Sequence, residues 1–142
     1  MKKAYLLFFI LFMGLSSFAQ SIHKTPQSRV LAQKMTSELM KTYNLSPTQT
    51  EEVKKIQEAK YEALVKLEPL KTKDVKKYIA KRLSTFETAD NSLMVLLDTP
   101  QMAIFKKQQI EKSNRYDEIV GGMKKQGVSV SEIEKKLAET EF

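Results

Sequence analysis

The sequence predicts an all-α protein of about four main helices, folded as long, thin antiparallel hairpins. Beyond residue 20, apolar residues recur at helical spacing and almost never alternate, which favours helix over strand. Residues that start helices, such as Ser or Asp close to Pro, separate the apolar stretches. The chain has no cysteine, so the fold must depend on packing and association rather than on disulfides.

The first residues predict a signal peptide over residues 1–19. Two lysines precede an apolar run over residues 4–15, and the small residues Ser17 and Ala19 follow it. Cleavage between Ala19 and Gln20 would export the chain to the cell envelope and lower its formal net charge from +7 to about +5. A retained anchor is the alternative, but it requires about 20 apolar residues. No later run reaches that length, so no stable membrane span is expected after cleavage.

The first predicted helix begins at Thr25, with Pro26 in its first turn, and ends at Asn44, which tolerates a left-handed backbone. The second runs from Ser46 to the stop at Pro69. The apolar stripes of these two helices are Val30, Leu31, Met35, Leu39 and Tyr43, and then Val53, Ile56, Ala63, Leu64 and Leu67.

The third predicted helix spans residues 72–97, a rod of roughly 37 Å at 1.5 Å per residue. The fourth begins at Asp98 and ends at Gly121 and Gly122, and a short last helix begins near Ser131, which has capping-box spacing to Glu134. The stripes of the third and fourth helices are Val75, Ile79, Leu83, Phe86, Leu93 and Leu97, and then Met102, Phe105, Tyr116, Ile119 and Val120. We expect one helical domain over residues 20–127 and a short helix or frayed tail over 128–142.

Two of these helix starts share one pattern, Leu45-Ser46-Pro47-Thr48-Gln49 and Leu97-Asp98-Thr99-Pro100-Gln101. In a capping box, the side chain of Ser46 or Asp98 accepts hydrogen bonds from first-turn amides, while Gln49 or Gln101 binds the amide of the cap residue. Each cap stabilises its helix by about 1 kcal/mol. The motif residues are Leu45, Ser46, Gln49, Leu97, Asp98 and Gln101.

With its two copies in an exported helical chain, the sequence resembles the Spy/CpxP family of periplasmic proteins, whose mark is a repeated Leu-Thr-x-x-Gln element. The resemblance spans residues 30–116, and Ser46 and Asp98 stand where the family has Thr. It implies a periplasmic, elongated, cradle-like homodimer with a basic, partly apolar concave face. Members act as ATP-independent chaperones or envelope stress modulators. Their client-contacting residues lie outside the motif, so none is transferred to this chain.

Basic residues crowd the first half of the third predicted helix, and acidic residues mark its far end, an order that opposes the helix dipole. The order is explained either by a solvated face or by an antiparallel homodimer that sets the basic half of one helix beside the acidic half of its twin. A second basic group lies on the fourth helix. The candidate basic face, for clients or for the dimer, is Lys73, Lys76, Lys77, Lys81, Arg82, Lys106, Lys107, Lys112 and Arg115.

Residues for catalysis are scarce. His23 is the only histidine, cysteine is absent, and no glycine-rich phosphate loop occurs. Adjacent Glu51 and Glu52 point about 100° apart on a helix, which is poor geometry for acid and base partners. We therefore predict no enzyme, no catalytic or metal-binding residue and no cofactor. Export argues against a nucleic-acid partner.

The expected function is an ATP-independent periplasmic chaperone that binds unfolded or misfolded envelope proteins through its basic face. The alternative is an envelope stress-response modulator or scaffold that binds one specific exported partner domain. A third interpretation is a structural helical bundle without clients. The sequence leaves these three open.

Overall fold

A computed structural model describes residues 25–140, which form six helices and no strand. The helices are α1 (Pro26–Tyr43), α2 (Pro47–Leu67), α3 (Leu70–Lys73), α4 (Val75–Leu96), α5 (Thr99–Lys125) and α6 (Val130–Glu139). This architecture confirms the all-α prediction. The predicted signal peptide, its cleavage site and His23 lie outside the described residues, as do Glu141 and Phe142. Within residues 25–140, no helix is long and apolar enough to cross a membrane.

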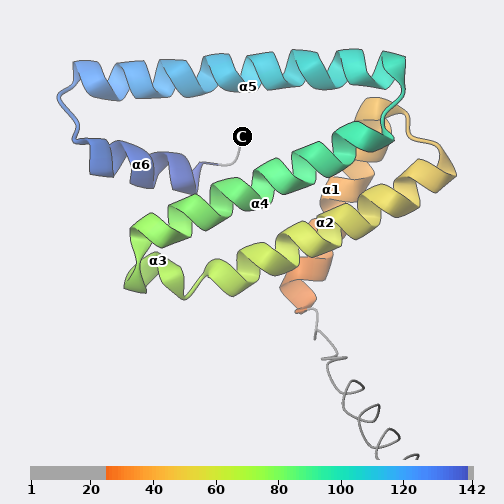
Figure 1. The fold of residues 1–142 in the computed structure, drawn as a ribbon, viewed down its shortest axis with the longest axis horizontal. Coiled ribbons are helices and arrows are strands. Elements are labelled where there is room, and N and C mark those ends of the chain that lie inside the picture. The colour runs from red at the N-terminus through yellow and green to blue at the C-terminus, as the bar shows by residue number, and fades with distance from the viewer. Residues whose placement is uncertain (1–24, 141–142) are drawn as a thin grey trace, which may run out of the picture.

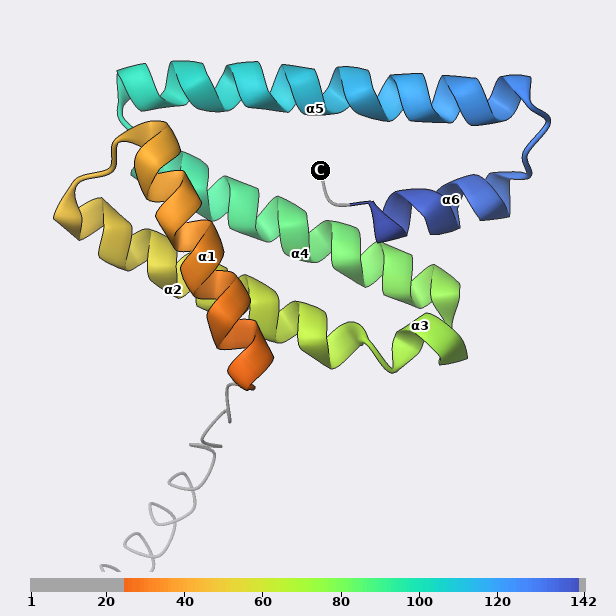
Figure 2. The same ribbon diagram turned by 180° about the vertical axis from the view of Figure 1, so that it is seen from behind.

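The helices are arranged as an open frame rather than a tight bundle (Figures 1 and 2). Helices α2 and α4 run antiparallel, joined through the short α3, and α1 crosses α2 obliquely on one face of this pair. Helix α5 leaves the end of α4 at an angle, so the two diverge like the arms of a V. Helix α6 turns back from the far end of α5 and contacts α4, which closes the V into a triangle.

The first two helices begin and end as predicted. Thr25 caps α1 by accepting a hydrogen bond from the Ser28 amide at 3.2 Å. Asn44 ends α1 in the left-handed conformation, with φ at 49°. Ser46 then caps α2, with Pro47 in the first turn, where its missing N–H costs nothing.

The third predicted helix begins later than residue 72. A separate turn, α3, ends at Lys73, and Asp74 adopts a non-helical conformation with φ at −156°. The Asp74 carboxylate accepts a hydrogen bond from the Lys77 amide at 3.0 Å and so caps α4. An aspartate satisfies exposed amides better at a helix start than in a helix interior, which explains the break.

The predicted end of the fourth helix at Gly121 and Gly122 is wrong, because α5 continues through both glycines to Lys125. The chain turns away from the helix at Gly127, two residues after Lys125, and the φ of 74° at Gly127 suits a residue without a Cβ. The Val128 amide binds the Met123 carbonyl at 3.1 Å, and the Gly127 amide binds the Lys124 carbonyl at 3.0 Å. This pair of bonds is a Schellman motif, which satisfies carbonyls that the helix end leaves free.

The cap of the last helix is Ser129, two residues before the predicted cap at Ser131. Ser129 accepts a hydrogen bond from the Glu132 amide at 3.3 Å, and Glu132 binds back to the Ser129 amide at 3.2 Å. This register places Val128 and Ile133 at the two positions of a hydrophobic staple, and Ile133 is buried. The predicted Ser131 and Glu134 box has the same spacing, but Lys135 would stand at the second staple position in place of an apolar residue.

The main hydrophobic cluster of buried residues lies where the α1–α2 turn meets the α4–α5 turn. It contains Tyr43, Leu45, Val53, Leu93 and Phe105, with Leu39, Leu96, Leu97 and Met102 packed around it. Burying large apolar side chains here contributes about 1.5–3 kcal/mol for each. The cluster fixes the base of the V formed by α4 and α5.

The predicted apolar stripe of the first helix is partly wrong. Val30 is 66% exposed, whereas the small residues Ser28, Ala32 and Thr36 are buried. The Thr36 hydroxyl is satisfied within its own helix, because it donates to the Ala32 carbonyl at 2.7 Å. Small side chains at four-residue spacing thus form most of the buried face of α1, and Tyr43 completes it at the end of the helix.

Candidate functional site

Both predicted capping boxes are present. At the start of α2, the Gln49 amide donates to Ser46 Oγ at 3.2 Å, and the Ser46 amide donates to Gln49 Oε1 at 3.0 Å. At the start of α5, the Gln101 amide donates to Asp98 Oδ1 at 2.9 Å, and the Asp98 amide donates to Gln101 Oε1 at 3.0 Å. The departure from Thr in both copies leaves the capping chemistry intact.

The two boxes also bind each other through their glutamines. Gln49 Nε2 donates to Gln101 Oε1 at 2.8 Å, and Gln101 Nε2 donates to Gln49 Oε1 at 3.2 Å. Gln49 Nε2 also donates to the carbonyl of Leu96, the last residue of α4, at 2.8 Å. The repeated motif is therefore a structural clasp, which joins the two helix turns above the main buried cluster.

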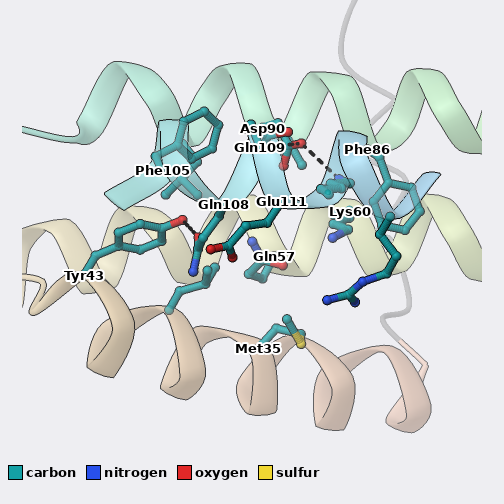
Figure 3. Close-up of a pocket in the computed structure, with 15 residues that line it drawn as sticks. Met35, Tyr43, Gln57, Lys60, Phe86, Asp90, Phe105, Gln108, Gln109 and Glu111 are labelled. Atoms are coloured by element: carbon teal, nitrogen blue, oxygen red, sulfur yellow. Dashed lines mark hydrogen bonds and ion pairs between the residues drawn. The ribbon is translucent and has the colours of Figure 1, made fainter. Parts of the chain in front are cut away.

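Beyond this clasp, a cavity of about 280 Å³ opens between α5 and the layer of α1, α2 and α4 (Figure 3). Its lining is mixed in character, with Tyr43, Phe86 and Phe105 beside Lys60, Asp90 and Glu111. The Tyr43 hydroxyl donates a hydrogen bond to Gln108 Oε1 across the cavity wall. Burial raises the pKa of Tyr43, and the nearby Asp90 carboxylate raises it further.

One aromatic ring in this cavity is surrounded by cations from different helices. Lys60 Nζ of α2 lies 4.2 Å from the centroid of the Phe86 ring, and the Arg82 guanidinium of α4 lies 4.8 Å from it. Lys112 Nζ of α5 lies 5.8 Å from the same centroid. Such placements stabilise a cation by about 0.5–1 kcal/mol at an exposed site.

Asp90 positions the α5 side of this cluster. Its Oδ2 lies 3.5 Å from Lys112 Nζ and accepts a hydrogen bond from Gln109 Nε2 at 3.1 Å. Two side chains of α5 are thus held against α4 by one carboxylate. The ion pair is partly exposed, so we expect it to contribute less than about 1 kcal/mol.

A second cavity, of about 270 Å³, lies farther along the V, where α6 closes it. Leu83 and Phe86 of α4, Tyr116 of α5 and Leu137 of α6 form its apolar walls. Phe86, Gln109 and Lys112 line both cavities. We call the two together the Phe86 groove, with a mixed end beside Tyr43 and an apolar end beside Leu137.

The structure places the predicted basic residues in different surroundings. Arg82, Lys112 and Arg115 line the Phe86 groove. Lys107 lies outward on α5 and pairs with Glu111 at 3.9 Å, and Lys106 lies near Asp98 and Met102 at the start of α5. Exposed positions on α3 and the first half of α4, away from the groove lining, are taken by Lys73, Lys76, Lys77 and Lys81.

Lys60 is the groove cation that the sequence analysis missed. It lies on α2, outside both basic groups, and only the packing of α2 against α4 brings it to Phe86. Lys60 Nζ also lies 5.5 Å from the ring centroid of its neighbour Tyr61. A lysine next to a tyrosine is not a sequence pattern that indicates a binding site. No local signal could have identified Lys60.

Within the described part of the chain, no group of three or more His, Cys, Asp or Glu side chains is placed to hold a metal ion. No protein-family model, curated protein or solved structure matches the chain.

Proposed function

We propose that the protein is a periplasmic, ATP-independent chaperone of the Spy/CpxP type, which binds unfolded or misfolded envelope proteins through the Phe86 groove. One observation carries this proposal: cations from α2, α4 and α5 surround a single aromatic ring in an open groove. The paired capping boxes support the resemblance to that family, because each copy of the motif caps a helix and the two copies bind each other.

The groove offers two kinds of contact to an unfolded chain. Lysine and arginine side chains attract acidic segments over a Debye length of about 8–10 Å at physiological salt. Phe86 and the exposed Leu83 then provide apolar surface for one or two side chains. Burying one such side chain is worth at most about 1.5–3 kcal/mol, so each contact is weak and reversible. Release therefore requires no nucleotide.

A light-scattering experiment tests the proposal. Two unrelated denatured proteins are diluted into buffer with and without the protein, at low and high salt and without nucleotide. We expect suppressed scattering for both, more strongly at low salt. Suppression of neither would refute the proposal and turn attention to one dedicated envelope partner.

Variants connect the activity to the groove. Phe86→Ala should reduce suppression, whereas Val95→Ala, at an 82% exposed position on the same helix, should not. Thermal melting by circular dichroism establishes that both variants are folded at the assay temperature. Equal activity of the two variants would contradict the assignment of the groove.

A further inference from the structure

A buried polar side chain at the mixed end of the Phe86 groove has an oxygen without a hydrogen-bond partner. Gln57 of α2 is 4% exposed and lines the cavity, where Figure 3 shows it between Tyr43 and Lys60. Within residues 25–140, no group donates a hydrogen bond to Gln57 Oε1. A buried acceptor without a donor destabilises a fold, so its presence in this cavity requires an explanation.

The position of Gln57 on α2 would suit an apolar side chain. It lies at four-residue spacing between Val53 and Tyr61, and these three residues form the buried face of the helix. The Tyr43 hydroxyl, which lines the same cavity, does not satisfy the glutamine, because it donates to Gln108 Oε1 instead. The Gln57 amide is therefore placed to bind a group that comes from outside the chain.

The cavity beside Gln57 has the size and the walls for one aromatic side chain. Its volume of about 280 Å³ lies just below the range of pockets that hold drug-sized ligands, roughly 300–1,000 Å³. Phe86 and Phe105 provide aromatic walls, and Leu39 and Leu93 provide aliphatic ones (Figure 3). An aromatic side chain that enters tip first brings a polar group on its tip to the buried amide.

A phenol matches the amide of Gln57 better than other aromatic groups do. A half-turn about its last side-chain bond lets the glutamine present either its oxygen or its NH₂ group to the cavity. A phenolic hydroxyl both donates and accepts, so it pairs with either group. An indole N–H only donates, and a phenyl ring does neither. The chemistry of the buried amide therefore favours tyrosine over tryptophan and phenylalanine.

The charges that line the cavity indicate what stands next to the tyrosine. Arg115 lines the cavity and is exposed, and Lys60 and Lys112 lie within 5.8 Å of the Phe86 ring centroid. Of the two carboxylates in the lining, that of Glu111 pairs with Lys107 at 3.9 Å and that of Asp90 with Lys112 at 3.5 Å. Arg115 is thus available to a carboxylate of the ligand.

We propose that the mixed end of the groove binds the side chain of a tyrosine that neighbours an acidic residue in an unfolded client. The tyrosine hydroxyl binds the Gln57 amide, and the acid lies beside Arg115. The client as the source of the tyrosine rests on the proposed chaperone function, whereas the phenol pocket does not. The pocket gives the groove a preference among clients, because a phenylalanine in the same place leaves the buried amide unsatisfied.

Two labelled peptides that differ by one oxygen atom test the proposal. Both are short, unfolded sequences of Gly, Ser and Glu, with a single central Tyr or Phe. Fluorescence anisotropy measures the dissociation constant of each peptide with the full-length protein. We expect the Tyr peptide to bind about fivefold more tightly, as one additional hydrogen bond allows. Equal affinities would overturn the proposal, and so would the absence of binding by both peptides.

A matched pair of variants assigns the preference to Gln57. Gln57→Leu removes the amide and should abolish the preference for Tyr, whereas Gln33→Leu on the exposed face of α1 should preserve it. Gln57→Leu should melt no lower than wild type, because leucine replaces a buried amide that lacks a partner. A preserved preference in Gln57→Leu would refute the assignment. A lower melting temperature would contradict it as well, because the amide would then stabilise the fold.

Two further comparisons separate the pocket from the chaperone function. Free p-cresol carries the phenol of tyrosine without a peptide, and we expect it to displace the Tyr peptide only at much higher concentration. Binding as tight as that of the peptide would overturn the client assignment and make the pocket a site for small phenols. Suppressed scattering without a preference for Tyr would refute the tyrosine pocket alone. A preference for Tyr without suppressed scattering would refute the chaperone function and leave the phenol pocket.

Discussion

The side-chain amides of Gln49 and Gln101 bind each other reciprocally, with Nε2 to Oε1 distances of 2.8 Å and 3.2 Å. Each glutamine also accepts a hydrogen bond from the amide of its own cap residue. The pair thereby links the α1–α2 turn to the α4–α5 turn, and it fixes the point from which α5 diverges. We therefore expect the angle between α4 and α5 to depend on this link.

We expect the two glutamines to be energetically coupled. Gln101 is 6% exposed, so Gln101→Ala leaves buried partners unsatisfied and should lower the free energy of unfolding by about 1–3 kcal/mol. Gln49→Ala should act similarly, and the double variant should cost less than the sum of the single variants. Urea unfolding measures each, with Gln33→Ala on the exposed face of α1 as the control. Strict additivity would show that the two amides act independently.

The cap residues should tolerate replacement by threonine but not by alanine. Ser46→Ala and Asp98→Ala each remove an acceptor for first-turn amides and should lower the free energy of unfolding by about 0.5–2 kcal/mol. Ser46→Thr and Asp98→Thr restore the residue of the Leu-Thr-x-x-Gln element. They should lower the free energy of unfolding by only about a few tenths of a kcal/mol. Denaturant melts of the four variants test this order. Equal losses for Ala and Thr would argue against a capping role.

Ionisation of Tyr43 should destabilise the fold at alkaline pH. Burial first, and the Asp90 carboxylate second, raise the pKa of Tyr43 above its ordinary value of 10.0. The stabilising contribution of the neutral hydroxyl is therefore complete below pH 10.0 and is lost as the pH rises through the pKa of the folded state.

Tyrosinate absorbance measures this ionisation, and the difference between wild type and Tyr43→Phe isolates the contribution of the one residue. Unfolding by urea should show a smaller alkaline loss of stability in Tyr43→Phe than in wild type. A difference curve with its midpoint at or below pH 10.0 would contradict the burial argument.

The charge order of α4 predicts a salt-dependent homodimer. If the basic half of α4 lies beside the acidic half of a second copy, Lys77→Glu with Lys81→Glu should weaken association at low salt. Adding Glu87→Lys to that double variant should partly restore it. Sedimentation equilibrium measures the dimerisation constant, and Lys54→Glu on the exposed face of α2 is the control. If the dimerisation constant of the double variant at low salt equals that of wild type, the antiparallel dimer is contradicted and the basic half of α4 is a solvated face.

Local physics explains why parts of the fold were predictable. The caps at Thr25, Ser46 and Asp98, and the left-handed Asn44, depend on interactions within about one turn of the helix, which a sequence pattern records. Gly121 and Gly122 misled the prediction. Glycine in a helix costs only about 1 kcal/mol, which a long helix tolerates, and the Schellman motif at Gly127 supplied a better stop.

The tertiary relationships were not predictable from the same patterns. Gln49 and Gln101 are 52 residues apart, and nothing in either capping box indicates that its glutamine binds a second one. Lys60 reaches Phe86 only through the packing of α2 against α4. The stripe predicted for α4 included Leu83, which lines an open groove instead of the core. Periodicity identifies apolar residues on one helix face, but it does not reveal which of them meets another helix.

The most direct test of the proposed client groove is the affinity of a permanently unfolded, fluorescently labelled acidic polypeptide for the protein, measured by anisotropy over a range of salt concentrations. Arg82→Gln with Arg115→Gln removes two groove cations without introducing acids, and Lys73→Gln with Lys76→Gln removes two cations outside it. We predict that the groove variant binds several-fold more weakly at low salt and depends less on salt, whereas the control pair matches wild type. Equal affinity of both variants would contradict client binding in the Phe86 groove.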